Sequence, residues 1–202
     1  MAELQLIRED IVLLGSNTLI QEENLCKYMY KTLNWSMKVK KGINTDFLKR
    51  NIHSKELIYH PIWLAKLLVI ADRKPFKPKK IPMMCFVDAV SGYRGLLTTV
   101  PKTTDHPIGS TKVIAPRIDK SEEVQKYIKD IQHTQINRSY VLKKPEHKIV
   151  EKFLVHLPIW KVQVEEGSFK KVFMINANTG ESEEYMSDQW KTEKWINNRK
   201  VR

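Results

Sequence analysis

Apolar residues recur every three to four positions in two separate stretches, which predicts two amphipathic helices. Thr18 and Gln21 have the spacing of a capping box ahead of the first stretch. Asp119 or Ser121 can cap the second helix. The predicted apolar faces consist of Leu25, Tyr28, Met29, Thr32 and Leu33 in the first helix, and of Val124, Tyr127, Ile128 and Ile131 in the second.

Other stretches carry the patterns of strands. Residues 57–71 are apolar or β-branched on both faces, which predicts a central strand. Residues 158–164 alternate between apolar and polar side chains, as a half-buried strand does. Pro75, Pro78 and Pro82 predict a long basic loop after the central strand. The other expected elements are strands at 83–89, 93–100, 112–118, 140–142, 149–155 and 172–177, a linker at 103–107, and a short helix at 187–198.

Two blocks of this pattern correspond to one another. Pro61-Ile62-Trp63 returns 97 residues later as Pro158-Ile159-Trp160, and Val87-Asp88-Ala89 returns as Ile175-Asn176-Ala177. The two helix faces also match. We therefore predict an α+β fold of two tandem repeats, each a helix followed by an antiparallel sheet, with a short C-terminal helix. Residues 1–102 form the first predicted repeat and residues 103–202 the second with its basic tail, either as two domains or fused into one.

The hairpin of the second half resembles that of the PepSY-type repeat, in which a strand led by Tyr or Trp precedes an Asp-Ala-x-Thr-Gly-like turn. Trp160 to Val164, Gly167 and Ile175 to Gly180 carry the resemblance. The first half shares Trp63 and the segment from Val87 to Gly92. The resemblance implies a small α+β sheet used for inhibition, binding or assembly, usually at the cell envelope.

Features of the sequence argue against an envelope location. The N-terminus lacks the basic start and long apolar core of a secretory signal. The apolar run 62–71 is interrupted by Lys66 and is shorter than the ~20 residues that span a bilayer. We therefore expect a cytoplasmic protein without a transmembrane segment.

The chain of 202 residues carries a formal net charge of +12, and this charge is the property that bears most on the kind of partner. Such a charge favours contact with nucleic acid, an anionic membrane surface or an acidic protein, although a merely solvated basic surface also explains it. Trp190 and Trp195 lie among cations and could stack on bases or insert at a membrane interface, or they could pack a C-terminal helix on the sheet. The candidate partner-binding residues are Arg73, Lys74, Lys77, Lys79, Lys80, Trp190, Trp195 and Arg199.

The side chains suited to catalysis have structural explanations. Asp88 with His60 could act as an acid–base pair, but Asn176 occupies the equivalent position and cannot serve as a general base. Both side chains can accept hydrogen bonds from turn amides, so we predict a turn cap. Cys26 and Cys85 have no metal or redox spacing, and we expect buried thiols, with a disulfide left open.

No phosphate-binding loop, nucleophile motif or zinc-binding signature is present in the sequence. We therefore predict no catalytic residue, no metal site and no cofactor. The expected function is that of a non-enzymatic binding or assembly protein, which recognises a protein or peptide through a sheet face or edge and the basic loop. A nucleic-acid-binding module and an unrecognised enzyme are the alternatives. The oligomeric state and the partner's identity stay open.

Overall fold

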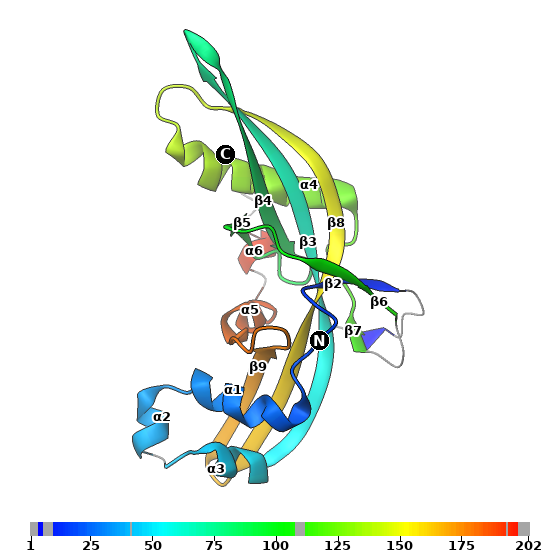
Figure 1. Ribbon diagram of the computed structural model, residues 1–202, viewed down its shortest axis with the longest axis vertical. Helices are drawn as coiled ribbons and strands as arrows, with labels where there is room; N and C mark the ends of the chain where they lie inside the picture. Colours follow the sequence, from blue (N-terminus) through cyan, green and yellow to red (C-terminus); the bar gives the residue numbers. More distant parts are fainter. Residues whose placement is uncertain (1–3, 6–9, 41, 108–111, 193, 198–202) are drawn as a thin grey trace.

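The structure, a computed structural model, describes residues 4–5, 10–40, 42–107, 112–192 and 194–197. Within these residues nine strands form one mixed sheet, surrounded by short helices (Figure 1). The strands are β1 (Leu4–Gln5), β2 (Ile11–Leu14), β3 (Ile52–Arg73), β4 (Phe76–Asp88), β5 (Arg94–Leu97), β6 (Thr103–His106), β7 (Lys112–Ile114), β8 (Glu146–Glu166) and β9 (Phe169–Asn176). The helices are α1 (Leu25–Thr32), α2 (Trp35–Lys40), α3 (Thr45–Arg50), α4 (Ser121–Ile131), α5 (Glu184–Gln189) and α6 (Lys194–Asn197), with shorter helical turns at Glu22–Asn24, Gln132–Ile136 and Asn137–Ser139.

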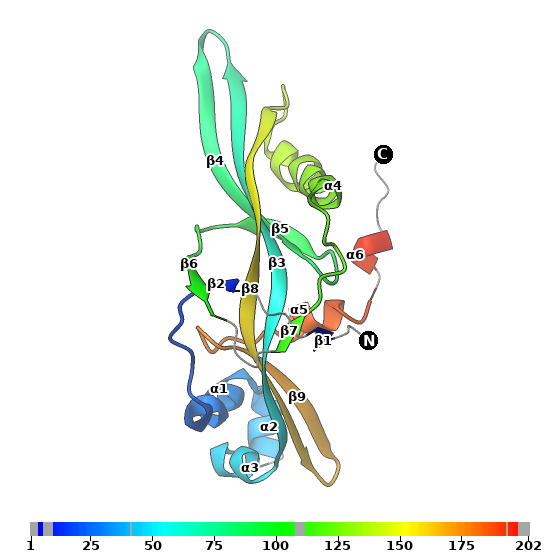
Figure 2. The ribbon, with the colours of Figure 1, turned by 90° about the vertical axis from the view of Figure 1, so that its right-hand side faces the viewer.

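The sheet is organised around the long strands β3 and β8, which pair antiparallel from Ile52 opposite Val164 to Ile70 opposite Glu146. Each of these strands continues into a hairpin with the next strand, β3 with β4 and β8 with β9. The two hairpins extend toward opposite ends of the molecule (Figures 1 and 2). The central pair therefore joins one strand from each half of the chain.

Pro61 and Pro158 lie inside these long strands, at points where the outer neighbour of the strand changes. Strand β3 pairs with β7 at Ile58 and Tyr59, and with β4 from Ile62 onward. Strand β8 pairs with β2 at His156, and with β9 from Ile159 onward. A proline lacks the N–H that an outer neighbour would need, so it is tolerated at such a gap.

The prediction of two tandem repeats is wrong, because the helices are exchanged between the halves. Helix α1 packs on β8 and β9, where Leu25 and Met29 join a core with Phe173. Helix α4 packs on β3 and β4, where Ile128 joins a core with Leu67. Pairing of β3 with β8 makes one continuous sheet, on which each helix covers the hairpin of the other half. The domain boundary between residues 102 and 103 stays a prediction.

The predicted helical faces are confirmed, whereas several loops and strands differ from expectation. The basic segment after β3 is not a long loop, because β4 already begins at Phe76. Residues 103–106 form strand β6 rather than a linker, and residues 140–142 are not a strand. Cys26 and Cys85 are both free and buried in different core clusters, which excludes a disulfide between them in this structure.

None of the helices in the described part of the chain is long and apolar enough to cross a bilayer.

Candidate functional site

The tip of the β3–β4 hairpin projects beyond the rest of the sheet (Figure 1). All residues from Arg73 to Lys80 are exposed, and the side chain of Phe76 is 70% exposed. The structure therefore brings five of the predicted partner-binding residues together on one projection: Arg73, Lys74, Lys77, Lys79 and Lys80. Arg199 lies outside the described residues.

A second exposed segment lies beside this hairpin. Val141 is 89% exposed and Leu142 is fully exposed, and Lys143 and Lys144 follow them directly. Lys143 Nζ lies 2.6 Å from Oδ2 of Asp72, next to the hairpin tip. This hydrogen bond and the positive charge of Lys143 hold the pKa of Asp72 below its ordinary value. We call the hairpin tip and this loop together, residues 73–80 and 141–143, the basic end.

The outer side of β4 is an open strand edge over residues 76–83, because β5 pairs only with Met84 to Val87 among the described residues. Pro78 and Pro82 stand in this edge and have no N–H to donate. Prolines and lysines on an edge oppose the addition of another strand. The edge is therefore poorly suited to capture a peptide by strand pairing, and recognition here falls to side chains.

Trp190 directly follows α5 and Trp195 lies in α6, and both helices lie beside the middle of the sheet, away from the hairpin tip (Figure 1). The Trp190 ring stacks on His60 with 4.1 Å between centroids, and its Nε1 donates to Oδ2 of Asp88 at 3.0 Å. Trp195 Nε1 donates to Oε1 of Gln189 at 2.8 Å. Both indoles are partly buried. The structure thus favours the packing interpretation of these tryptophans over the stacking of bases.

Asp88 caps its turn, as the sequence predicts. Oδ1 accepts hydrogen bonds from the backbone amides of Val90 at 2.8 Å and Ser91 at 3.0 Å. Oδ1 of Asn176 does the same for Asn178 at 2.9 Å and Thr179 at 3.1 Å. The two turns therefore share one hydrogen-bonding scheme, despite the difference in charge.

The difference between the two caps follows from their outer partners. Asp88 faces donors, since Trp190 Nε1 binds Oδ2 and His60 Nε2 lies 3.0 Å from Oδ1. Asn176 faces an acceptor, because its Nδ2 donates to Oε1 of Glu183 at 2.9 Å. A carboxylate suits the first environment and an amide the second.

The contact between His60 and Asp88 is fully buried, and both side chains have no exposed surface. Burial acts to raise the pKa of Asp88, but the positive charge of the nearby His60 and the hydrogen bonds of the turn amides outweigh it and lower this pKa. Neither Nδ1 nor Nε2 of His60 forms a hydrogen bond among the described residues, although Nε2 lies 3.0 Å from Oδ1 of Asp88. Trp190 covers the pair, so the predicted neighbours do meet, but in the interior of the protein.

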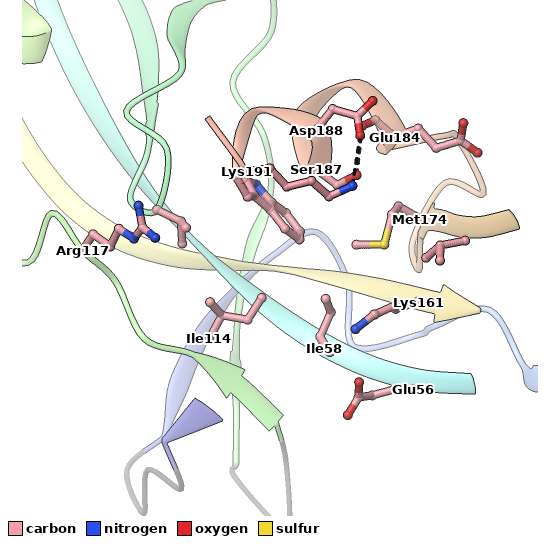
Figure 3. Close-up of a pocket in the computed structure, with 13 residues that line it drawn as sticks. Glu56, Ile58, Ile114, Arg117, Lys161, Met174, Glu184, Ser187, Asp188 and Lys191 are labelled. Atoms are coloured by element: carbon pink, nitrogen blue, oxygen red, sulfur yellow. Dashed lines mark hydrogen bonds and ion pairs between the residues drawn. The ribbon is translucent and has the colours of Figure 1, made fainter. Parts of the chain in front are cut away.

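A cavity of about 680 Å³ lies on one side of the sheet, between α5, β9 and the segment after β7 (Figure 3). Its carboxylates have cationic partners: Glu184 with Lys171 at 2.8 Å, Asp188 with Lys191 at 3.6 Å, and Glu56 with Lys112. Each of these three carboxylates is thus paired with a lysine. The lining residues are Glu56, Ile58, Val90, Ile114, Arg117, Lys161, Val172, Met174, Glu184, Ser187, Asp188, Trp190 and Lys191.

The described residues contain no group of three or more His, Cys, Asp and Glu side chains placed to hold a metal ion. The chain matches no protein-family model, no curated protein and no solved structure. The resemblance to the PepSY-type repeat therefore stays a prediction.

Sequence reasoning singled out the five cations of the hairpin tip but missed Lys143 and the apolar residues of the basic end. Val141 and Leu142 looked like a short strand, because β-branched and apolar residues next to a tyrosine favour one. The signal that could have identified them is the position of these two apolar residues between Tyr140 and two lysines, just ahead of Pro145.

Proposed function

We propose that this protein is a binding protein, and that its basic end docks on an anionic surface of its partner. The observation that carries the proposal is the concentration of five exposed cations on one projecting hairpin tip. Asp72, the acidic residue at the start of this tip, already pairs with Lys143. The net charge of the tip therefore stays strongly positive, and a positive projection attracts polyanions and steers their approach.

The open edge of β4 supports side-chain recognition over strand pairing, as Pro78 and Pro82 deprive it of donors. An acidic protein or peptide, the kind of partner that the sequence predicts, offers such an anionic surface. The nucleic-acid hypothesis keeps its support from charge, but Trp190 and Trp195 are engaged within the fold and add nothing to it.

Charge reversal tests this proposal. The variant K77E/K79E/K80E is compared with K27E/K49E/K161E, which changes the net charge equally at exposed lysines outside the basic end. Binding of fluorescein-labelled heparin, a polyanion without sequence, is measured by anisotropy between 50 and 300 mM salt. We expect the first variant to bind at least ~10-fold more weakly than the second and to lose about one unit of salt slope per lysine. Equal losses in the two variants would show that the basic end is not the binding surface.

A further inference from the structure

The basic end carries apolar side chains as well as cations, and these have no role in a purely electrostatic contact. Phe76 is 70% exposed, Val141 is 89% exposed and Leu142 is fully exposed. Large apolar side chains exposed together indicate a surface that contacts something apolar. Protection of the open β4 edge against pairing with another strand explains the lysines and prolines of the hairpin. It does not explain Val141 and Leu142, which lie outside any strand.

An ion pair links the two segments that carry these apolar side chains. Lys143 follows Leu142 directly and contacts Asp72, one residue before Arg73. The loop that carries the second tip is itself braced, because Lys144 Nζ donates to the carbonyl oxygens of Tyr140 at 2.6 Å and Asn137 at 3.0 Å. The start of β4, which carries Phe76, and the loop before β8, which carries Leu142, therefore lie toward the same end of the molecule (Figure 1).

The exposed apolar side chains of both segments are next to cations in the sequence. Phe76 lies between Lys74 and Lys77, separated from the former by Pro75, and Leu142 precedes Lys143 and Lys144. An anionic bilayer has the complementary arrangement, with negative headgroups above an apolar interior. Apolar side chains that enter this boundary and lysines that remain among the phosphates contribute to binding together.

We propose that the basic end is a membrane-surface contact, in which Phe76, Val141 and Leu142 enter the headgroup region of an anionic bilayer. This inference rests on the proposed function, since it names the anionic surface that the basic end meets. The cations of the hairpin tip bind the headgroups, namely Arg73, Lys74, Lys77, Lys79 and Lys80, while the β3–β4 hairpin holds the rest of the sheet away from the bilayer.

Vesicle sedimentation tests the inference. The full chain is mixed with phosphatidylcholine vesicles that contain either 30% phosphatidylserine or none. We expect binding to the anionic vesicles to exceed binding to the neutral ones by about fivefold for each basic residue that reaches the headgroups. The variant F76Q/L142Q keeps every charge, and we expect it to bind anionic vesicles about 10-fold more weakly than the unaltered protein. Its binding to heparin stays unchanged.

The matched control is W35Q/V39Q. Trp35 and Val39 are 72% and 57% exposed, and helix α2 lies at the end of the molecule opposite the hairpin tip (Figure 1). We expect this variant to bind anionic vesicles like the unaltered protein. A loss of binding in this control, with none in F76Q/L142Q, would overturn the assignment to the basic end.

Entry into the bilayer is measured separately by labelling. Cys26 and Cys85 are buried in the folded protein, so L142C can be labelled selectively with a nitrobenzoxadiazole maleimide under native conditions. Its fluorescence should rise several-fold with anionic vesicles. Unchanged fluorescence, together with unchanged binding of F76Q/L142Q, would overturn the inference.

The two proposals fail in different ways. Binding to heparin but not to anionic vesicles would overturn the membrane contact and leave the proposed function, with an acidic protein or a nucleic acid as the partner. Binding to neither probe would overturn both.

Discussion

Asn176 donates its side-chain N–H to Oε1 of Glu183 at 2.9 Å, in the turn that follows β9. The equivalent cap, Asp88, instead accepts a hydrogen bond from Trp190. Each turn thus has the side chain that its outer partner requires, and this complementarity makes the two residues non-interchangeable.

We predict that exchanging either cap lowers the free energy of unfolding. D88N sets an amide N–H against the indole N–H of Trp190, at a cost of about 1–3 kcal/mol. N176D sets a second carboxylate against Glu183, whose pKa burial already raises, and costs roughly 3 kcal/mol at pH 7. The penalty of N176D should shrink as the pH falls, because protonation of one of the two carboxylates removes their repulsion.

Urea unfolding at pH 7 and pH 5 measures both effects. N24D serves as the control, since Asn24 is exposed and its side chain caps no helix amide. A pH-independent penalty in N176D would contradict the repulsion from Glu183.

His156 makes stability depend on pH in the mildly acidic range. Burial lowers its pKa from 6.5 to about 4, while a backbone hydrogen bond to Val12 and the charge of His60 have smaller effects. The unfolded chain binds this proton below pH 6.5, whereas the folded protein binds it only near pH 4. The stabilisation is therefore complete above pH 6.5 and is lost as the pH falls toward 4, by roughly 3 kcal/mol.

Unfolding free energies measured between pH 7 and pH 4 test this prediction. In H156Q the free energy of unfolding should depend less steeply on pH over this range than in the unaltered protein. H133Q, at an exposed histidine, should retain the slope of the unaltered protein. Equal slopes in all three proteins would rule out His156 as the source.

Three glycines with positive φ should respond differently to alanine. Gly180 has φ +76°, and a Cβ there would lie 2.0 Å from the ring of Tyr28. Gly92 has φ +74°, and its Cβ would lie 3.0 Å from the ring of Tyr127. Gly167 has φ +52° with open space around it.

We predict the order of stability G167A > G92A > G180A. G167A meets only the left-handed backbone cost of about 1 kcal/mol. In G92A a tight contact with Tyr127 adds to this backbone cost. In G180A the new Cβ overlaps Tyr28 and displaces its ring, so the free energy of unfolding falls by roughly 3–4 kcal/mol in total. Thermal and urea unfolding rank the variants. A G180A protein as stable as G167A would show that Tyr28 moves aside without loss.

The exchange of helices between the halves predicts that the halves depend on one another. Fragment 1–102 separates β3 from β8 and leaves α1 without the β8–β9 hairpin that it covers. Fragment 103–202 leaves α4 without the β3–β4 hairpin. We expect each fragment alone to lack near-UV circular dichroism, and an equimolar mixture to recover it. Cooperative unfolding of either fragment alone would instead support independent domains.

The sequence by itself determined several local features of this protein. The spacing of Val124, Tyr127, Ile128 and Ile131 was sufficient to predict the buried face of α4, because a helical face repeats every 3.6 residues. Asn176 opposite Asp88 was sufficient to predict two capped turns, since both residues accept from nearby amides. These are interactions between residues close together in the chain.

Tertiary structure alone decided which elements meet. Periodicity shows that a helix has an apolar face but not which hairpin that face packs on. The sequence therefore could not predict that α1 and α4 each cover the hairpin of the other half. The prolines of β4 indicated a loop, because only the position of the strand at a sheet edge makes them acceptable. Asp72 and Lys143 are 71 residues apart, and no local pattern brings Phe76 and Leu142 to one end of the molecule. Contacts of this kind depend on the packing of the whole sheet, which is the physical reason why the candidate site became visible only in three dimensions.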